Sequence, residues 1–187
     1  LVTEFCPRGN LFDLLHNRRV PLTFDTRCKM ALDAAKGMSF LHSSEPPILH
    51  RDLKSLNLLV TDDWSCKVSD FGLSRFKAIG PSGLMTAQVG TCHWMSPEVI
   101  QGFRYSEKAD VYSFAINLWE LLTRSVPYKG MQPMQVSMAV LTRGLRPTIP
   151  PDCPRSYARL MQAAWHPDPA ARPSFPDIID TLSAMLA

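Results

Sequence analysis

Apolar residues recur at helical spacing in the first quarter of this chain. Between residues 23 and 43 they share one stripe of a helix with 3.6 residues per turn: Cys28, Ala31, Ala35, Met38 and Leu41. Two prolines at positions 46 and 47 then predict the end of this helix. A shorter helix is predicted for residues 10–16, with Asn10 as its N-cap.

The later part of the chain is mostly helical by pattern. The segment from Ser106 to Arg124 is apolar almost all round, which is typical of a central, buried helix. Three amphipathic helices are predicted after it, at about 133–143, 155–166 and 175–186. Gly144 ends the first of them, and the last begins with a serine–aspartate cap at 174 and 177. Three methionines, Met131, Met134 and Met138, are expected to face the core.

Short apolar runs between the helices predict a small β element. Residues 58–68 form an expected hairpin around the turn at 61–63, and residues 48–49 are a further apolar run. Residues 1–5 also have the pattern of a strand. Residues 72–97 lack periodicity, and a loop of this length inside a compact domain is usually functional or disordered. We therefore predict one domain of the α+β class over residues 1–187.

The composition of the chain argues against several classes of function. Of 187 residues, 45% are hydrophobic and 20% are charged, as in an ordinary globular protein. The net charge of +3 is too small to indicate nucleic acid or an anionic membrane as a partner. No apolar run approaches the ~20 residues that span a bilayer. Because the chain opens on Leu1 inside an apolar run, we expect an excerpt whose beginning is missing.

The cysteines indicate a reducing environment. They are odd in number, widely spaced and without a C-x-x-C pair: Cys6, Cys28, Cys66, Cys92 and Cys153. This spacing argues against a disulfide framework and against a zinc site. The expected location is cytoplasmic.

One loop concentrates the residues that can do chemistry. Asp52, Lys54 and Asn57 lie within six residues, and Asp70 follows after the predicted hairpin, which can bring it back beside Asn57. Amide and carboxylate oxygens suit Mg²⁺ that also holds phosphates. Asp52 suits the orientation and deprotonation of a hydroxyl, and Lys54 suits the neutralisation of a transferring phosphoryl group.

At these residues the sequence resembles the C-terminal lobe of a protein kinase. His50–Asn57 and Asp70–Gly72 match the catalytic-loop and Asp-Phe-Gly motifs of that family. Met95–Glu98 resembles its Ala-Pro-Glu motif, Asp110–Phe114 the start of its central helix, and Arg172–Phe175 its late arginine motif. The likeness covers essentially the whole chain. It implies a protein-kinase-like fold with the hinge and the C-terminal lobe present and the N-terminal lobe absent.

The resemblance implies ATP and Mg²⁺ as cofactors and gives the loop residues their roles. Asp52 would be the catalytic base, and Lys54 would contact the γ-phosphate. Asn57 and Asp70 would bind Mg²⁺. A regulatory site is implied as well.

In that regulatory site, Arg51 and Arg75 would bind a phosphate on the activation segment. Thr86 is the first candidate for its attachment and Ser82 the second.

Other positions would bind adenine or support the fold. Thr3 would be the gatekeeper, the backbone of Glu4 and Cys6 would hydrogen-bond adenine, and Leu59 would lie beneath it.

The supporting residues would form two groups. His50 and Phe71 would belong to the hydrophobic spine, anchored through Asp110, and Glu98 would form a buried ion pair with Arg172.

The kind of kinase follows from a mixture of features. Lys54 and the Gly90-Thr91 pair resemble serine/threonine kinases, whereas Trp94 and Trp119 resemble tyrosine kinases. This mixture resembles the tyrosine-kinase-like group and implies protein substrates. The alternative is a pseudokinase or scaffold, because the Gly-rich loop and strand lysine are not in this chain. Asn117 departs from the family pattern, and in a buried helix it needs a hydrogen-bond partner.

Overall fold

The computed structural model describes residues 3–70, 75–76 and 91–187. The helices are α1 (Leu11–His16), α2 (Phe24–His42), α3 (Pro97–Ile100), α4 (Glu107–Thr123), α5 (Pro133–Arg143), α6 (Arg155–Ala164) and α7 (Phe175–Leu186). The strands are β1 (Ile48–Leu49), β2 (Leu58–Val60), β3 (Cys66–Val68) and β4 (Arg75–Phe76). Short 3-10 turns lie at Ser55–Asn57, Thr91–Trp94 and Pro169–Ala171. The described chain is therefore mainly helical with two small antiparallel sheets, as the α+β prediction requires.

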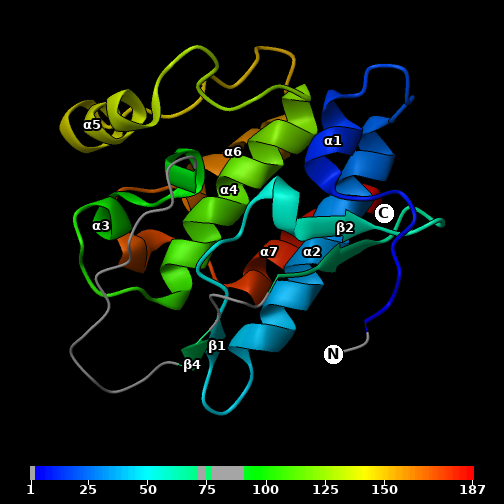
Figure 1. The fold of residues 1–187 in the computed structure, drawn as a ribbon, viewed down its shortest axis with the longest axis horizontal. Coiled ribbons are helices and arrows are strands. Elements are labelled where there is room, and N and C mark those ends of the chain that lie inside the picture. The colour runs from blue at the N-terminus through cyan, green and yellow to red at the C-terminus, as the bar shows by residue number, and fades with distance from the viewer. Residues whose placement is uncertain (1–2, 71–74, 77–90) are drawn as a thin grey trace.

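Helix α4 lies at the centre of the molecule (Figure 1). Every residue from Ala109 to Leu121 is buried, which confirms the expectation from its nearly continuous apolar pattern. Arg124 ends the helix in a left-handed conformation with φ of 53°. None of the helices in the described ranges is both long and apolar enough to cross a bilayer.

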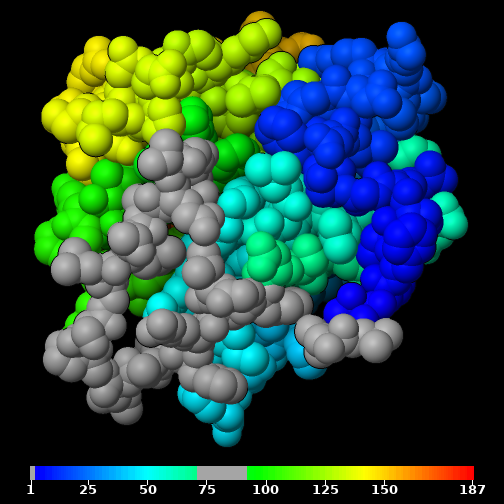
Figure 2. All heavy atoms as spheres, viewed as in Figure 1, coloured from blue at the N-terminus to red at the C-terminus, as the bar shows by residue number. Residues whose placement is uncertain are grey.

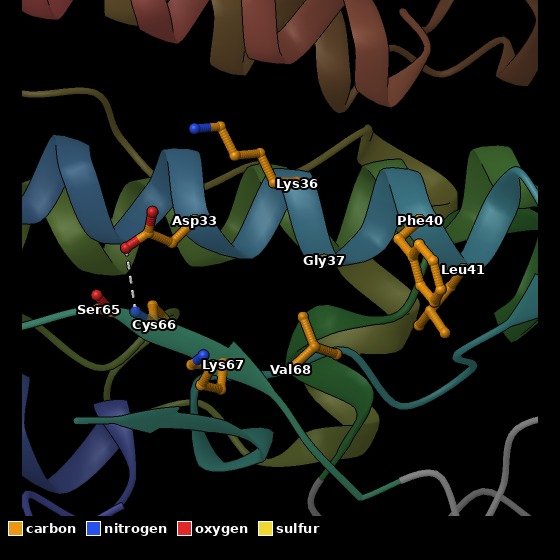
Figure 3. A pocket seen from close by; sticks show the side chains of 9 residues that line it. All are labelled: Asp33, Lys36, Gly37, Phe40, Leu41, Ser65, Cys66, Lys67 and Val68. Carbon is orange, nitrogen blue, oxygen red and sulfur yellow. Dashed lines mark hydrogen bonds between the residues drawn. The ribbon is translucent and has the colours of Figure 1, made fainter.

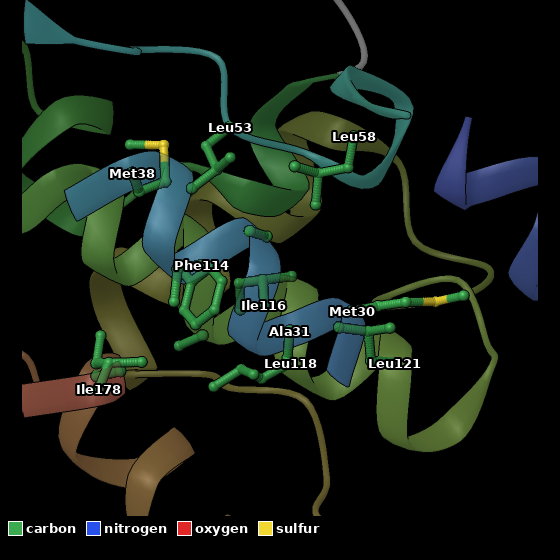
Figure 4. Close-up of a cluster of buried hydrophobic side chains, with 14 of the residues drawn as sticks. Met30, Ala31, Met38, Leu53, Leu58, Phe114, Ile116, Leu118, Leu121 and Ile178 are labelled. Atoms are coloured by element: carbon green, nitrogen blue, oxygen red, sulfur yellow. The ribbon is translucent and has the colours of Figure 1, made fainter. Parts of the chain in front are cut away.

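Helix α2 completes the core against α4 and α7 (Figure 4). Thr23 caps its N-terminus by accepting a hydrogen bond from the Thr26 amide, so the helix begins where the sequence predicts. The whole predicted stripe is buried, including Ala31 and Met38 in the cluster that Figure 4 shows. Buried residues of α2, α4 and α7 thus belong to one hydrophobic core.

The hairpin predicted for residues 58–68 is present. Leu58 pairs with Val68, and Val60 pairs with Cys66. Helix α2 crosses strand β3 of this hairpin, and Gly37 faces Val68 at the crossing (Figure 3). A Cβ atom at position 37 would lie 2.8 Å from Val68 Cγ2, so this crossing requires glycine.

Several local predictions differ from the structure. Residues 3–5 are exposed and form no strand, because their backbone groups pair with no other strand in the described ranges. Helix α6 ends at Ala164, two residues early, where Trp165 becomes its C-cap. The segment expected to be a loop, residues 72–97, contains β4, which pairs with β1, and the 3-10 turn at Thr91–Trp94, and α3 begins at its last residue, Pro97.

The prediction that the methionines of α5 face the core is wrong. Met134 is 73% exposed and Met138 is 53% exposed. The helix instead buries Val136, Ala139 and Val140, which lie on its opposite side. Helical spacing identifies two apolar faces here, and only tertiary packing decides which of them is covered.

Candidate active site

The candidate catalytic loop, residues 50–57, begins on a carboxylate of the central helix. Asp110 Oδ2 accepts hydrogen bonds from the His50 amide at 3.0 Å and from His42 Nε2 at 2.9 Å. Its Oδ1 accepts from the Arg51 amide at 3.0 Å and from the Tyr105 hydroxyl at 2.7 Å. Burial by itself raises the pKa of Asp110, but these donors and the charge of His42 lower it below its usual value. The start of the loop is thereby fixed to α4.

The His50 ring fixes the next turn, which leads into Asp52. The His50 ring accepts a hydrogen bond at Nδ1 from the Asp52 amide, at 3.3 Å, and its Nε2 lies 2.9 Å from the Ser69 carbonyl. Both contacts fit the tautomer that carries its proton on Nε2. Arg51, between them, has a φ of 70°. This left-handed residue reverses the chain and separates the buried imidazole from the carboxylate that follows.

Three predicted catalytic side chains converge at one point. Lys54 Nζ lies 2.7 Å from Oδ2 of Asp52, in an ion pair whose side chains are 13% and 7% exposed. Asn57 Nδ2 donates to the same Oδ2 at 3.1 Å and to the main-chain carbonyl of Asp52 at 2.8 Å. Neither contact uses Oδ1 of Asp52. The loop therefore holds a carboxylate in a fixed orientation with a cation beside it.

The predicted metal ligands are brought together by the hairpin. Ser69 donates through both its amide and its hydroxyl to the Asn57 carbonyl, each at 2.9 Å. Asp70 follows directly, is exposed and has a φ of 59°. The side-chain nitrogen of Asn57 donates its hydrogen bonds within the loop. The side-chain oxygen, Oδ1, is therefore available as an acceptor. Amide and carboxylate oxygens beside one another fit a hard divalent cation such as Mg²⁺.

The segment expected to bind adenine lies along β2. The Arg8 amide donates to the Val60 carbonyl at 3.2 Å, and Asn10 forms an isolated antiparallel bridge with Leu59. Cys6 is buried, and burial raises the pKa of its thiol, with a further contribution from Glu4. Residues 8–10, which follow Cys6, therefore lie beside Leu59 and Val60 of β2. Thr3 lies further along the same segment and is exposed.

Glu98 and Arg172 form the ion pair that the sequence predicts. Arg172 donates to the two carboxylate oxygens at 2.7 and 2.9 Å and is itself 2% exposed. Burial alone raises the pKa of Glu98, but its hydrogen bonds and charge interaction with Arg172 lower it overall. This pair joins the short helix α3 to the segment before α7, more than 70 residues later in the chain.

A further buried network was not predicted. Glu120 of α4 is fully buried and accepts hydrogen bonds from Ser55 Oγ at 3.0 Å and from Trp94 Nε1 at 2.8 Å. Burial raises its pKa to about 8, against the smaller opposing effects of those two donors. The available signal was an acidic residue within the apolar run Leu118–Leu122 of the helix. The network links the catalytic loop to residues 91–94.

Some residues predicted for regulation or for the hydrophobic spine lie outside the described part of the chain. Phe71, Ser82 and Thr86 lie outside them. The backbone of Arg75 pairs with Leu49 in the β1–β4 sheet, next to the start of the catalytic loop. Arg51 Nε is buried and has no partner among the residues that the structure describes, and the guanidinium lies 5.8 Å from the Tyr105 ring centre.

The predicted lack of disulfides and of a zinc site can be compared with the structure directly. All five cysteines lie in the described ranges, and each is free. Within those ranges no group of three or more histidine, cysteine, aspartate or glutamate side chains is arranged to hold a metal ion.

Comparison with known proteins gives consistent matches. A sequence model described as "Protein tyrosine and serine/threonine kinase" matches residues 1–182. Serine/threonine-protein kinase STY46 of Arabidopsis thaliana is 46% identical over 182 residues, which cover 97% of this chain and 31% of that protein. The probable serine/threonine-protein kinase drkC of Dictyostelium discoideum is 46% identical over 186 residues, covering 99% of this chain and 25% of that protein. The chain thus spans about a third or less of the length of these relatives.

Proposed function

Because the chain belongs to the protein tyrosine and serine/threonine kinase family, we propose that it forms the hinge and C-terminal lobe of an active kinase domain. The reaction is transfer of the γ-phosphate of ATP to serine and threonine hydroxyls of protein substrates. The printed names of the relatives support the choice of serine and threonine. Lys54 together with Trp94 supports placement in the tyrosine-kinase-like group.

The observation that carries this proposal is the arrangement of three side chains around Asp52. Its Oδ2 is held by Lys54 and Asn57, so Oδ1 can accept the proton of a substrate hydroxyl. Lys54, beside it, neutralises charge that develops on the transferring phosphoryl group. Catalysis of phosphoryl transfer is mostly positioning and electrostatic stabilisation, and this loop supplies elements of both.

Asn57 and Asp70 would hold Mg²⁺ through their side-chain oxygens. The bound ion would supply positive charge to the phosphates of ATP. The hydrogen bond of Ser69 to the Asn57 carbonyl at 2.9 Å supports this pairing of ligands, since Asp70 follows Ser69 directly in the chain.

The test is Asp52→Asn in the full-length protein. Phosphate transfer to a serine/threonine peptide library should fall by roughly 10²–10⁴-fold, the usual contribution of a general base. ATP affinity should change little, because Asp52 contacts the hydroxyl and not the nucleotide. Asp62→Asn, at an exposed turn whose main-chain carbonyl binds Arg8, is the matched control. Near-normal turnover in Asp52→Asn would exclude this base, and a wild-type protein without transfer would favour the scaffold alternative.

Regulation by phosphorylation is part of the same proposal. Arg51 has an unsatisfied buried Nε, and the backbone pairing of Arg75 with Leu49 supports a second cation nearby. A phosphate on Thr86 or Ser82 would bind such a pair through charge-assisted hydrogen bonds. Replacing Ser82 and Thr86 together by alanine should then prevent activation on incubation with ATP. Equal activity of this variant and the wild type would contradict the regulatory model.

A further inference from the structure

Helix α4 carries a buried polar stripe on the side that faces the catalytic loop. Its members are spaced by three, four and three residues and are at most 5% exposed: Asp110, Ser113, Asn117 and Glu120. This spacing puts them on one face of the helix. The other buried residues of the helix are apolar or aromatic, and the stripe coincides with the surface that touches residues 50–55 and 94.

Asn117 is the member of the stripe whose side chain reaches the loop between the predicted catalytic groups. Its Nδ2 donates to the Ser113 carbonyl at 2.8 Å and lies 3.4 Å from the Leu53 carbonyl. Both neighbours are acceptors, so the nitrogen of the amide must point toward them. Leu53 lies directly between Asp52 and Lys54, and its carbonyl orientation defines the peptide plane that leads into Lys54.

The other side of Lys54 is held by the same helix. Ser55 Oγ donates to Glu120 at 3.0 Å, one turn along α4 from Asn117. The chain is therefore fastened to α4 on each side of Lys54. The position of its ammonium group relative to Asp52, 2.7 Å away, depends on these two attachments.

The side chain of Asn117 carries a stability cost. It is fully buried, and its Oδ1 has no hydrogen-bond partner in the described part of the chain. A buried polar atom without a partner destabilises the folded state. Leucine has nearly the same shape and would remove the unsatisfied oxygen. The donor lost with it makes only a long contact, 3.4 Å, to the Leu53 carbonyl, so stability favours leucine at this position.

We propose that Asn117 is a positioning residue for the catalytic loop, retained for its hydrogen bond to the Leu53 carbonyl at the expense of stability. This inference rests on the proposed kinase function. It predicts that activity and stability respond in opposite directions to removal of the amide, because the amide orients the loop while its oxygen destabilises the core.

The test is Asn117→Leu in the full-length protein. The unfolding temperature of the kinase domain should rise by about 2–6 °C, as expected for removal of an unsatisfied buried group from a domain of this size. The kcat should fall by about tenfold or more, since small misplacements of reacting groups are costly. The KM for ATP should stay within about twofold. A purely structural role would lower kcat and the unfolding temperature together.

Two further variants sharpen the result. Ile116→Val, at the fully buried neighbouring position, should lower the unfolding temperature and leave kcat unchanged. If Asn117→Leu does not fold, Asn117→Ala should show the same loss of kcat with a lower unfolding temperature. With an active wild type, an unchanged kcat in Asn117→Leu, or a folded Asn117→Leu that loses kcat and stability together, overturns the inference alone. If only Asn117→Ala folds, an unchanged kcat in that variant overturns it. A wild type that transfers no phosphate overturns the proposed function first, and the inference with it.

Discussion

Glu98→Gln should produce one of the largest losses of stability that a single conservative change can cause in this protein. The guanidinium of Arg172 is almost completely buried and donates to the two oxygens of Glu98 at 2.7 and 2.9 Å. It also donates to the carbonyls of His166 and Lys108, each at 2.8 Å. Glutamine keeps the size of the side chain and one acceptor, but it leaves the positive charge of Arg172 buried without a counter-ion.

The magnitude follows from that uncompensated charge. Breaking a buried pair by removing one partner costs about 3–5 kcal/mol, whereas removing both partners can be nearly neutral. The free energy of unfolding should therefore fall by about 3–5 kcal/mol in Glu98→Gln. The double variant Glu98→Gln/Arg172→Met should lose clearly less than the sum of the two single variants, because no unpaired charge remains.

Urea unfolding followed by circular dichroism measures these changes as shifts of the midpoint at constant slope. Glu4→Gln is the control, because the ion pair of Glu4 with Lys67 is exposed and at 3.4 Å, and should matter little. Strictly additive losses in the double variant would refute the reasoning. A loss in Glu98→Gln as small as that in Glu4→Gln would refute it as well.

The pH dependence gives a second check on the same pair. Folding lowers the pKa of Glu98, because the interaction with Arg172 outweighs the burial that raises it. The stabilisation is therefore complete above the pKa of glutamate in the unfolded chain, about 4.3, and is lost as pH falls through the lower folded-state pKa. The difference in stability between wild type and Glu98→Gln should shrink in acid.

Two other substitutions test the packing of α2 and the buried acid of α4. Gly37→Ala should lower the urea midpoint even though alanine favours a helix by about 1 kcal/mol, because its Cβ would lie 2.8 Å from Val68 Cγ2. In a Val68→Ala background the same change should raise the midpoint, and a gain in both backgrounds would contradict the argument. Burial raises the pKa of Glu120 to about 8 from 4.5, so the unfolded chain releases this proton first and wild-type stability should fall as pH rises between those values. Glu120→Gln should flatten this slope in thermal unfolding at several pH values, and an unchanged slope would rule out Glu120 as its source.

The helices were predictable because their signals are local. Asn10, Thr23 and Ser174 accept the hydrogen bonds from backbone amides that their capping roles require. Gly144 ends α5 with a φ of 61°, a conformation that glycine adopts without strain. Each of these features depends on residues within one or two helical turns, so the chain itself carries the information.

The features that escaped prediction depend on contacts between distant segments. Nothing near Met134 indicates that α5 will bury its opposite face, and nothing near Ile48 indicates that it will pair with residues 75–76. The contact of Glu120 with Trp94 joins positions 26 residues apart. The catalytic set was predicted by resemblance of motifs, since composition and periodicity cannot show that Lys54 and Asp52 will form an ion pair.

The buried stripe of α4 explains how a loop without regular structure can hold reacting groups in place. Asp110 fixes the amides of His50 and Arg51, and Glu120 binds Ser55, so both ends of the loop depend on one rigid helix. Backbone amides in a loop lack the hydrogen-bond acceptors that a helix or sheet supplies. They must therefore find acceptors elsewhere or stay solvated. Here Asp110 accepts from the two backbone amides and Glu120 accepts from the Ser55 hydroxyl, and the surrounding apolar core keeps both side chains in place. Order at the catalytic loop thus depends on the helix beneath it, and substitutions of the polar α4 residues that bind the loop should affect activity without touching any substrate.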